Sequence, residues 1–438
     1  MGGYIPNSAA AQQAMLESLG LTSVQQLFDC IPSEMLVDHL NIPEGLSELE
    51  VGEMLTAMAD KNKRFSTVFR GAGAYNHYIP SIVKAVTSKK EFLTAYTPYQ
   101  AEISQGVLQS IFEYQTMICQ LTGMDVSNAS VYDGATAAAE AVVMCQERKR
   151  SRAVVSGALN PHFIEVIQTY CGSRGIPVEI LPVQNGLTDP AALSAALKAD
   201  DACVLFQNPN YYGLLENCDA LTEAAHAVGA KAVAVVNPMT LGILKTPGAY
   251  GADIAVGEGQ PLGIPMAFGG PYLGFMAATQ AMMRKLPGRI VGQTTDAKGN
   301  RAFVLTLQAR EQHIRREKAS SSVCSNQALC ALTAAVYLAS MGPDGLADCA
   351  KQCLRNAHYA ASEIAKIPGF GLRHNAPFFH EFVTECPICP QLLNEKLAEK
   401  GILGGLPVEG GILWCATEMN NKNQIDRLVE ILKEVAAQ

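Results

Sequence analysis

The chain has 438 residues, 48% of them hydrophobic, which excludes a disordered chain or a disulfide-stapled miniprotein. Its 33 Lys and Arg against 41 Asp and Glu residues give a net charge of −8 without any basic run, so we expect no nucleic acid and no membrane as a partner. No stretch reaches the roughly 18 unbroken apolar residues of a membrane helix, and the N-terminus lacks the pattern of a signal peptide, so a cytoplasmic protein is predicted.

Residues 1–65 are predicted to form a helical N-terminal arm. Asn7 or Ser8 can cap a first helix through its side-chain oxygen, and Ser47 with Glu50 three residues later fits a capping box for a later helix. A short helix is expected between these two. We expect the arm to pack on something larger.

Residues 66–344 are predicted to form a large α/β domain. After a helix from Val107 to Thr122, short apolar runs alternate with helical patterns, which is typical of a mostly parallel sheet covered on both faces. The predicted strands are 153–156, 178–183, 202–207, 231–236 and 253–256, and the predicted helices between them are 161–171, 189–198 and 216–228. In such folds ligands bind at the carboxyl ends of the strands.

The last third of the chain is predicted to leave the large sheet. Gly299-Asn300 indicates a hairpin turn before a strand at 302–307. A helix at 325–339 ends at Gly342-Pro343, and a small α+β domain, residues 345–438, follows. Its predicted elements are a helix at 348–366, a strand at 378–383, a helix at 390–400, a strand at 412–416 and a helix at 424–436.

The first motif is a turn of small residues that opens a helix at Gly134. Backbone N–H groups at such a helix start favour an anion, and small residues let a phosphate approach. Asp133, however, is itself an anion placed to cap the helix. The residues leave both interpretations open, although a carboxylate here would repel a phosphate.

Two further positions argue against a complete pyridoxal phosphate site in this chain. Such a cofactor needs a carboxylate near its pyridine nitrogen and a lysine for its Schiff base. The strand predicted at 231–236 is followed by the neutral Asn237, and no lysine lies between Lys245 and Lys285.

The turn Asn208-Pro209-Asn210 follows the strand predicted at 202–207. A turn at a strand end can face a ligand crevice, but most such turns are simply turns.

Charge is concentrated in residues 308–318, which contain Arg310, His313 and Arg315. The segment is either a solvated surface or a site that binds carboxylates or a partner, since arginine suits bidentate contacts with carboxylates.

The 13 cysteines are scattered, and we expect reduced, buried thiols at positions 119, 145, 203, 324 and 330. Cys349 and Cys353 lie four residues apart on a predicted helix, and Cys386 and Cys389 form a CxxC motif. A zinc site needs four ligands at suitable spacing, and no second ligand pair accompanies the motif, so no metal is expected.

Several stretches together resemble the glycine cleavage system P protein family. Tyr96 to Gly106 is similar to its TPYQ-E-SQG motif, and Gly134 to Ala141 to its GTAAAEA helix start. Residues 256–260 and 269–271 resemble its GEGQ and GGP loop, and residues 307–324 its LQTREQHIRRDKATSNIC block. Ala309 stands where the family usually has Thr, and Ala101 where it usually has Pro.

The resemblance covers nearly the whole chain and is closest to the N-terminal half of the family, which split systems make as subunit 1. It implies a fold-type-I pyridoxal phosphate transferase architecture. It also implies an enzyme that decarboxylates glycine and passes the aminomethyl group to lipoyl-bearing H protein. The family's Schiff-base lysine lies in a His-Lys motif of the other half, and this sequence contains no His-Lys dipeptide.

The resemblance therefore implies that subunit 2 binds pyridoxal phosphate covalently, while this chain has a degenerate site near Gly134, Asn237 and Gly259. No catalytic residue is expected in this chain alone. The residues expected to complete the active site at the subunit interface are Tyr96, Thr97, Tyr99, Gln100, Glu102, Arg310, His313 and Arg315. Two alternatives stay open: a non-catalytic scaffold subunit, and a stand-alone pyridoxal phosphate enzyme that uses Lys245.

Overall fold

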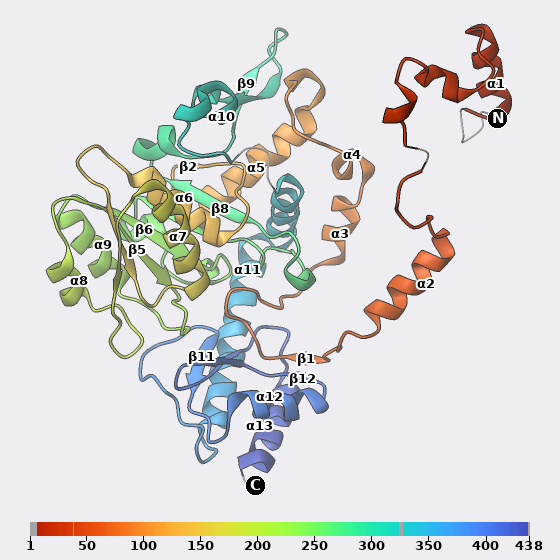
Figure 1. Ribbon diagram of the computed structural model, residues 1–438. Helices are drawn as coiled ribbons and strands as arrows, with labels where there is room; N and C mark the ends of the chain where they lie inside the picture. The colour runs from red at the N-terminus through yellow and green to blue at the C-terminus, as the bar shows by residue number, and fades with distance from the viewer. Residues whose placement is uncertain (1–6, 38, 324–326, 437–438) are drawn as a thin grey trace. The chain divides into compact units, whose positions relative to one another are not determined.

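The computed structural model describes residues 7–37, 39–323 and 327–436, which form two compact units, 1–64 and 65–438 (Figure 1). In the first unit, helix α1 (Ala9–Ser18) is capped by Ser8, and helix α2 (Glu48–Ala59) begins with the predicted capping box of Ser47 and Glu50. A 3-10 helix, Val24–Phe28, lies between them. The packing partner of this arm stays a prediction.

A seven-stranded sheet organises the second unit, in the order β2-β8-β7-β6-β5-β3-β4. The antiparallel β8 is the exception in an otherwise parallel sheet. The strands are β2 (Val126–Ser127), β3 (Arg152–Ser156), β4 (Val178–Leu181), β5 (Asp201–Asn208), β6 (Lys231–Val236), β7 (Ile254–Glu258) and β8 (Gly274–Ala278). The five predicted strands are confirmed within two residues at each end, and β2 and β8 are additions.

Apolar side chains on both sides of the sheet explain why helices cover both faces. Along β6, Val233 and Val235 join the core under helices α6 and α7, whereas Ala232 and Ala234 join the core on the opposite side. This alternation follows from the two-residue period of a strand. The helices of this part are α3 (Ser81–Thr87), α4 (Lys90–Leu93), α5 (Gln105–Thr122), α6 (Gly134–Cys145), α7 (Pro161–Arg174), α8 (Pro190–Ala196) and α9 (Cys218–Ala227).

A hairpin of β9 (Ile290–Thr295) and β10 (Arg301–Thr306) follows, with the predicted turn at Gly299. Two glutamine side chains of α5 bind this hairpin. Gln105 pairs with the N–H and C=O of Phe303 at 2.9 and 2.8 Å, and Gln115 pairs with those of Val291 at 2.9 and 3.0 Å. The two amides therefore fix the hairpin against the start and the middle of α5.

Helix α11 (Ala328–Ile364) differs from the two separate helices predicted here. Its backbone leaves the helical region at Gly342, where the break was expected, but the helix resumes at once instead of at residue 348. Pro343 explains this, because proline fits the first turn of a helix. By length and composition alone α11 could cross a membrane. It packs into the core of the large sheet and into that of the C-terminal part, so the boundary at residue 344/345 stays a prediction.

The C-terminal part contains an antiparallel sheet, β11-β14-β13, packed against the end of α11 (Figure 1). Its elements are β11 (Glu381–Thr384), α12 (Pro390–Glu399), β12 (Ile402–Leu403), β13 (Leu406–Val408), β14 (Gly411–Cys415) and α13 (Lys422–Ala436). The short strand β1 (Thr67–Val68) pairs in parallel with β12. The chain then continues as residues 69–80, which we call the strap.

Of the five cysteines expected to be buried, Cys145 and Cys203 are buried, but Cys119 and Cys330 are only partly so, which corrects that expectation. Their helices α5 and α11 leave these positions partly open to solvent. Cys324 lies outside the described residues.

Candidate functional site

Two carboxylates of this chain occupy the N-terminus of α6. Asp133 accepts the backbone N–H of Thr136 at 2.7 Å, so the predicted cap forms, and Glu258 accepts that of Gly134 at 3.0 Å. A Cβ at Gly134 would lie 2.8 Å from Glu258 N and from a ring carbon of Phe163. The glycine thus lets β7 approach the helix closely enough for Glu258 to take the place of an external anion.

Burial shapes the charge of Glu258. Removal from water raises its pKa to about 7, against the opposing effect of N–H groups donated by Leu273, Gly134 and Gln260, and the neighbouring Asp133 carboxylate raises it further. Gly259 beside it has little room, because a Cβ there would lie 2.8 Å from Leu273 Cδ2.

The strap crosses the carboxyl ends of the sheet strands. Gln260, just after β7, exchanges two hydrogen bonds with the backbone of Tyr75 at 2.8 and 2.9 Å. Asn160, after β3, donates to Ala72 O at 3.1 Å. From the C-terminal part, Glu381 accepts the Tyr75 hydroxyl at 2.8 Å and the Ala72 N–H at 2.6 Å. The strap therefore fills the edge of the sheet where this type of fold binds ligands.

Two neutral side chains, Asn237 and His380, lie together at the end of β6. Asn237 Nδ2 lies 3.4 Å from His380 Nε2, and burial lowers the pKa of His380 to about 3, so that ring is uncharged. Lys245 lies before β7 and is paired with Asp219 at the surface. The turn after β5 is held within the chain, since Asn210 donates to Gly186 O and to Glu216 at 2.8 Å each.

The loop expected at a subunit interface is largely exposed. Tyr96 is 83% and Tyr99 64% exposed, and Gln100 and Glu102 are exposed as well, whereas Thr97 is half-buried. The guanidinium of Arg289 lies over the ring of Tyr99, 4.9 Å from its centroid. Arg289 is buried, so Tyr99 rests on a fixed cation while its outer face stays open.

Arg289 also contacts the charged segment, residues 308–318. Arg289 Nε lies 3.6 Å from Glu311 Oε2, and His313 Nδ1 lies 3.6 Å from that oxygen too. Glu311 is buried at the N-terminus of the short helix α10 (Gln312–Arg315). The structure thus brings Tyr99 and His313 to the two sides of one buried ion pair.

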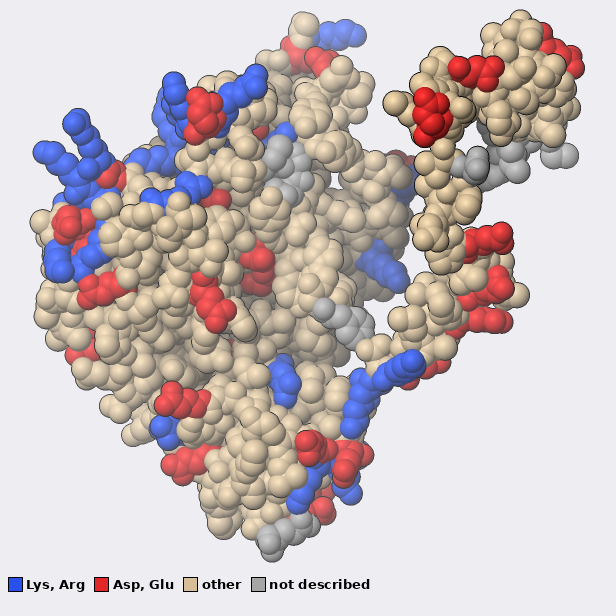
Figure 2. Space-filling model, in the orientation of Figure 1, with Lys and Arg blue, Asp and Glu red and all other residues tan. Residues whose placement is uncertain are grey.

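Arg310 and Arg315 are placed differently. Arg310 is half-buried and donates to Leu286 O, and burial lowers its pKa, while Arg315 is exposed. Figure 2 shows Lys and Arg side chains, with Asp and Glu side chains among them, over the α10 region as well as at other places on the same face. No local pattern in the sequence indicates Arg289, Tyr75, Glu258 or Glu381, because each contacts a partner far away in the chain.

Similarity to solved structures identifies the fold class of the chain. An aspartate aminotransferase of Thermus thermophilus has the same fold, with a TM-score of 0.59 at 16% identity over 85% of this chain and 99% of that one. The chain is thus an α/β protein of pyridoxal phosphate fold type I, as predicted.

The model of the glycine cleavage system P-protein family matches residues 2–432, and the chain belongs to this family. A "probable glycine dehydrogenase (decarboxylating) subunit 1" of Moorella thermoacetica is 49% identical over 99% of this chain and 100% of its own length. A crystal structure of glycine decarboxylase (P-protein) in inhibitor-bound form has a TM-score of 0.93 at 43% identity, covering 99% of this chain and 100% of that one.

The fold class implies pyridoxal phosphate, but the residues at this edge of the sheet do not fit that group. The helix start that would meet a phosphate already binds Glu258 and is capped by Asp133, two carboxylates that repel an anion. The strap occupies the adjoining strand ends, and Asn237 supplies no carboxylate. No lysine lies between residues 245 and 285 to form the covalent bond.

Proposed function

We propose that this chain is subunit 1 of a two-subunit glycine dehydrogenase (decarboxylating) of the glycine cleavage system. It binds no pyridoxal phosphate itself. The cofactor is held covalently by subunit 2, glycine is the substrate, and lipoyl-bearing H protein accepts the aminomethyl group. We place the enzyme in the cytoplasm, where the free thiols of the described chain suit a reducing compartment.

The observation that carries this proposal is the hydrogen bond of Glu258 to the start of α6. It fills the anion position of the fold with the chain's own carboxylate, and the bonds of the strap to Gln260 and Glu381 fill the space beside it. Because the chain's own residues occupy the ligand position, we infer that this subunit contributes to the enzyme through residues on its surface.

The contribution of this chain to the active site is proposed to come from the Tyr96–Glu102 loop. Aromatic and amide groups that are exposed here suit a partner's glycine or lipoyl path, and Arg289 fixes Tyr99 from below. Arg310, His313 and Arg315 are proposed as the second contribution, by binding carboxylates or forming ion pairs across the interface.

The test is an absorbance titration with pyridoxal phosphate, followed by borohydride reduction and peptide mapping. It is carried out on this chain alone and on an active mixture with subunit 2. We expect the label on a lysine of subunit 2 only. A labelled lysine in this chain alone, Lys245 included, overturns the proposal and establishes an independent pyridoxal phosphate enzyme.

A non-catalytic scaffold is the second candidate, and the occupied ligand position favours it as well. In that case changes in the Tyr96–Glu102 loop alter assembly or leave turnover unchanged. The active-site role requires the opposite, a loss of turnover in a fully assembled pair.

A further inference from the structure

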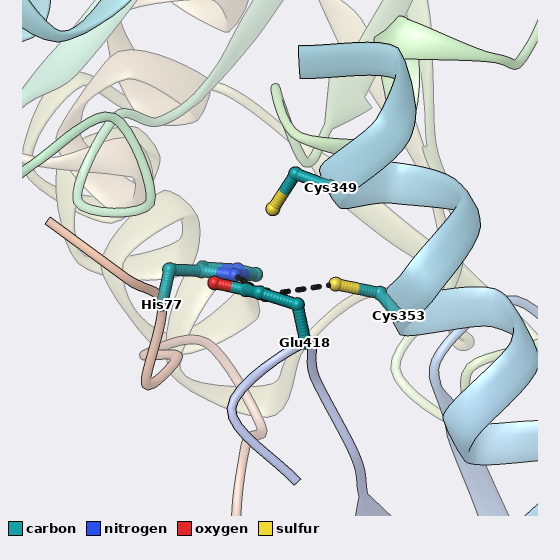
Figure 3. A group of neighbouring side chains, drawn as sticks. All are labelled: His77, Cys349, Cys353 and Glu418. Carbon is teal, nitrogen blue, oxygen red and sulfur yellow. Dashed lines mark hydrogen bonds and ion pairs between the residues drawn. The ribbon is translucent and has the colours of Figure 1, made fainter. Parts of the chain in front are cut away.

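Four potential metal ligands meet where the strap, helix α11 and the loop after β14 come together. They are His77 of the strap, Cys349 and Cys353 of α11, and Glu418 after β14, and their ligand atoms all lie within 4.8 Å of one another. The two cysteines are one helical turn apart and point to the same side, where they face His77 and Glu418 (Figure 3).

The group is enclosed. Both thiols and the His77 ring are buried, and the Glu418 side chain is 10% exposed. Glu418 Oε2 lies 2.8 Å from His77 Nδ1 and accepts the thiol of Cys353 at 3.1 Å. His77 Nε2 is buried without a hydrogen-bond partner among the described residues, although the Cys349 thiol lies beside the ring.

Surrounding hydrogen bonds hold the ligands in place. Glu418 Oε1 accepts the N–H of Tyr78 at 2.6 Å. The residue before it, Thr417, donates its hydroxyl to Asn76 O at 2.6 Å and its N–H to Asn420 at 2.9 Å. Bonds of this kind orient ligands before a metal binds, and they raise affinity.

We propose that His77, Cys349, Cys353 and Glu418 form a structural Zn²⁺ site. Two thiolates, an imidazole and a carboxylate are ligands that Zn²⁺ accepts, and four protein ligands make a closed, tetrahedral site. Zinc–ligand bonds of about 2.0–2.3 Å give ligand-to-ligand distances of about 3.3–3.8 Å. The ligand atoms lie within 4.8 Å of one another, so side-chain shifts of about 1 Å are enough to reach the separations of a tetrahedral site.

Binding has a simple balance. The two thiol protons leave to solvent, and a charged His77 ring also loses its second ring proton. Zn²⁺ then takes the two thiolates, the neutral imidazole and the carboxylate, and the bonds from Glu418 to His77 and Cys353 are replaced by bonds to the metal. A surface hollow lined by Tyr78, Gly345, Cys349 and Glu418 gives the ion a way in. The bound metal fastens the strap to α11 and to the loop after β14, segments far apart in the sequence, so the strap stays across the sheet edge.

No metal is expected from the sequence, because no second ligand pair accompanies the CxxC motif of Cys386 and Cys389. His77 and Glu418 lie 341 residues apart, and only the fold brings them to Cys349 and Cys353. The proposal is independent of the proposed function, since it concerns zinc content and not turnover.

The test is zinc analysis of the full chain, purified without chelators and then dialysed against a buffered trace of Zn²⁺. We expect about one zinc per chain, and much less in the double variant C349S/C353S. Cys171→Ser is the matched control, because Cys171 is also a fully buried helical thiol. If the double variant fails to fold, Glu418→Gln provides the test, because it keeps the shape of the side chain. We expect this variant to retain zinc at least tenfold more weakly than the wild-type chain.

Cobalt replacement of the wild-type chain adds a readout of geometry. We expect the intense absorption of tetrahedral Co²⁺ with thiolate ligands, and its loss in Glu418→Gln or in C349S/C353S. The proposal is overturned if the wild-type chain holds no zinc after dialysis or if the double variant retains as much as Cys171→Ser. A mass lower by two hydrogens, with Cys349 and Cys353 joined as a disulfide, overturns it as well.

Discussion

Glu258 Oε2 accepts the backbone N–H of Gly134 at 3.0 Å, so a carboxylate of the chain sits where a helix start of this fold can hold an anion. The two residues are 124 positions apart, and the close approach of β7 to α6 that joins them requires glycine at position 134. The bond fills the anion position at the start of α6 with a group of the chain itself. The effect of the Glu258 carboxyl on stability can be measured as a function of pH.

We expect the Glu258 carboxyl to make stability fall as pH rises from about 4.5 to about 7. Its pKa is raised from 4.5 to about 7 in the folded chain by burial, so the folded state binds more protons than the unfolded state in that window. The free energy of unfolding then declines by at most about 1.4 kcal/mol per pH unit from this group. The decline is absent from Glu258→Gln.

Urea unfolding of both proteins at intervals from pH 4.5 to 8 measures the difference. The quantity compared is the free energy of unfolding of the wild-type chain minus that of Glu258→Gln, because the contributions of other titrating groups cancel in it. If this value rises with pH, the pKa of Glu258 is not raised.

Tyr75→Phe tests the strap. The substitution removes the hydroxyl that Glu381 accepts and leaves a buried carboxyl oxygen without that partner, which costs about 1–3 kcal/mol of folding free energy. Tyr78→Phe is the matched control, since Tyr78 is an exposed strap residue and its change is expected to stay within about 0.5 kcal/mol. Equal effects of the two substitutions in urea unfolding refute a fastening role for Tyr75.

Much of the fold follows from the sequence because its signals are local. The run Lys231–Val236 and its neighbours are short, apolar and separated by helical patterns, and they form strands as predicted. The strands β2 and β8 were missed for physical reasons. Strand β2 has only two residues, and β8 depends on pairing with β7. The kink of α11 was visible at Gly342, but the restart at Pro343 was not.

The site was less predictable because its chemistry lies in contacts between distant segments. The neutral Asn237 and the lysine gap are properties of single positions, so the sequence alone could argue against a cofactor bond. No local pattern indicates that Glu258 binds the start of α6, that Glu381 accepts the Tyr75 hydroxyl or that Arg289 lies over the Tyr99 ring. These partners are brought together only by folding.

Arg289→Ala is expected to be strongly destabilising. It leaves Glu311 buried without the guanidinium 3.6 Å away and removes the cation beneath Tyr99. Breaking one side of a buried ion pair costs about 3–5 kcal/mol. The double variant R289A/E311A is expected to recover part of that loss, as urea unfolding can measure. A double variant as unstable as the sum of the single ones refutes the pairing.

Gln115→Ala tests how the hairpin is held to α5. The side chain binds both the N–H and the C=O of Val291, and its loss leaves two buried backbone groups unpaired, at about 1–3 kcal/mol each. The control is Gln109→Ala, because Gln109 lies partly exposed on the same helix and donates its side-chain amide to Glu113 instead of to the hairpin. Hydrogen exchange of the β9 and β10 amides is expected to quicken in Gln115→Ala alone. Unchanged exchange there would show that the hairpin does not depend on this amide.

The double variant Y99A/Q100A separates an active-site role from a scaffold. Both side chains are exposed, so we expect little change in folding, about 0.5–1 kcal/mol at most from the cation–π contact of Tyr99. With subunit 2 we expect normal assembly and a fall in kcat/KM for glycine of about tenfold or more, equivalent to about 1.4 kcal/mol. Sedimentation of the pair and steady-state decarboxylation measure the two quantities, with Gln109→Ala as the surface control. Full turnover in an assembled variant pair rejects the loop assignment, and failure to assemble instead makes the loop a binding surface.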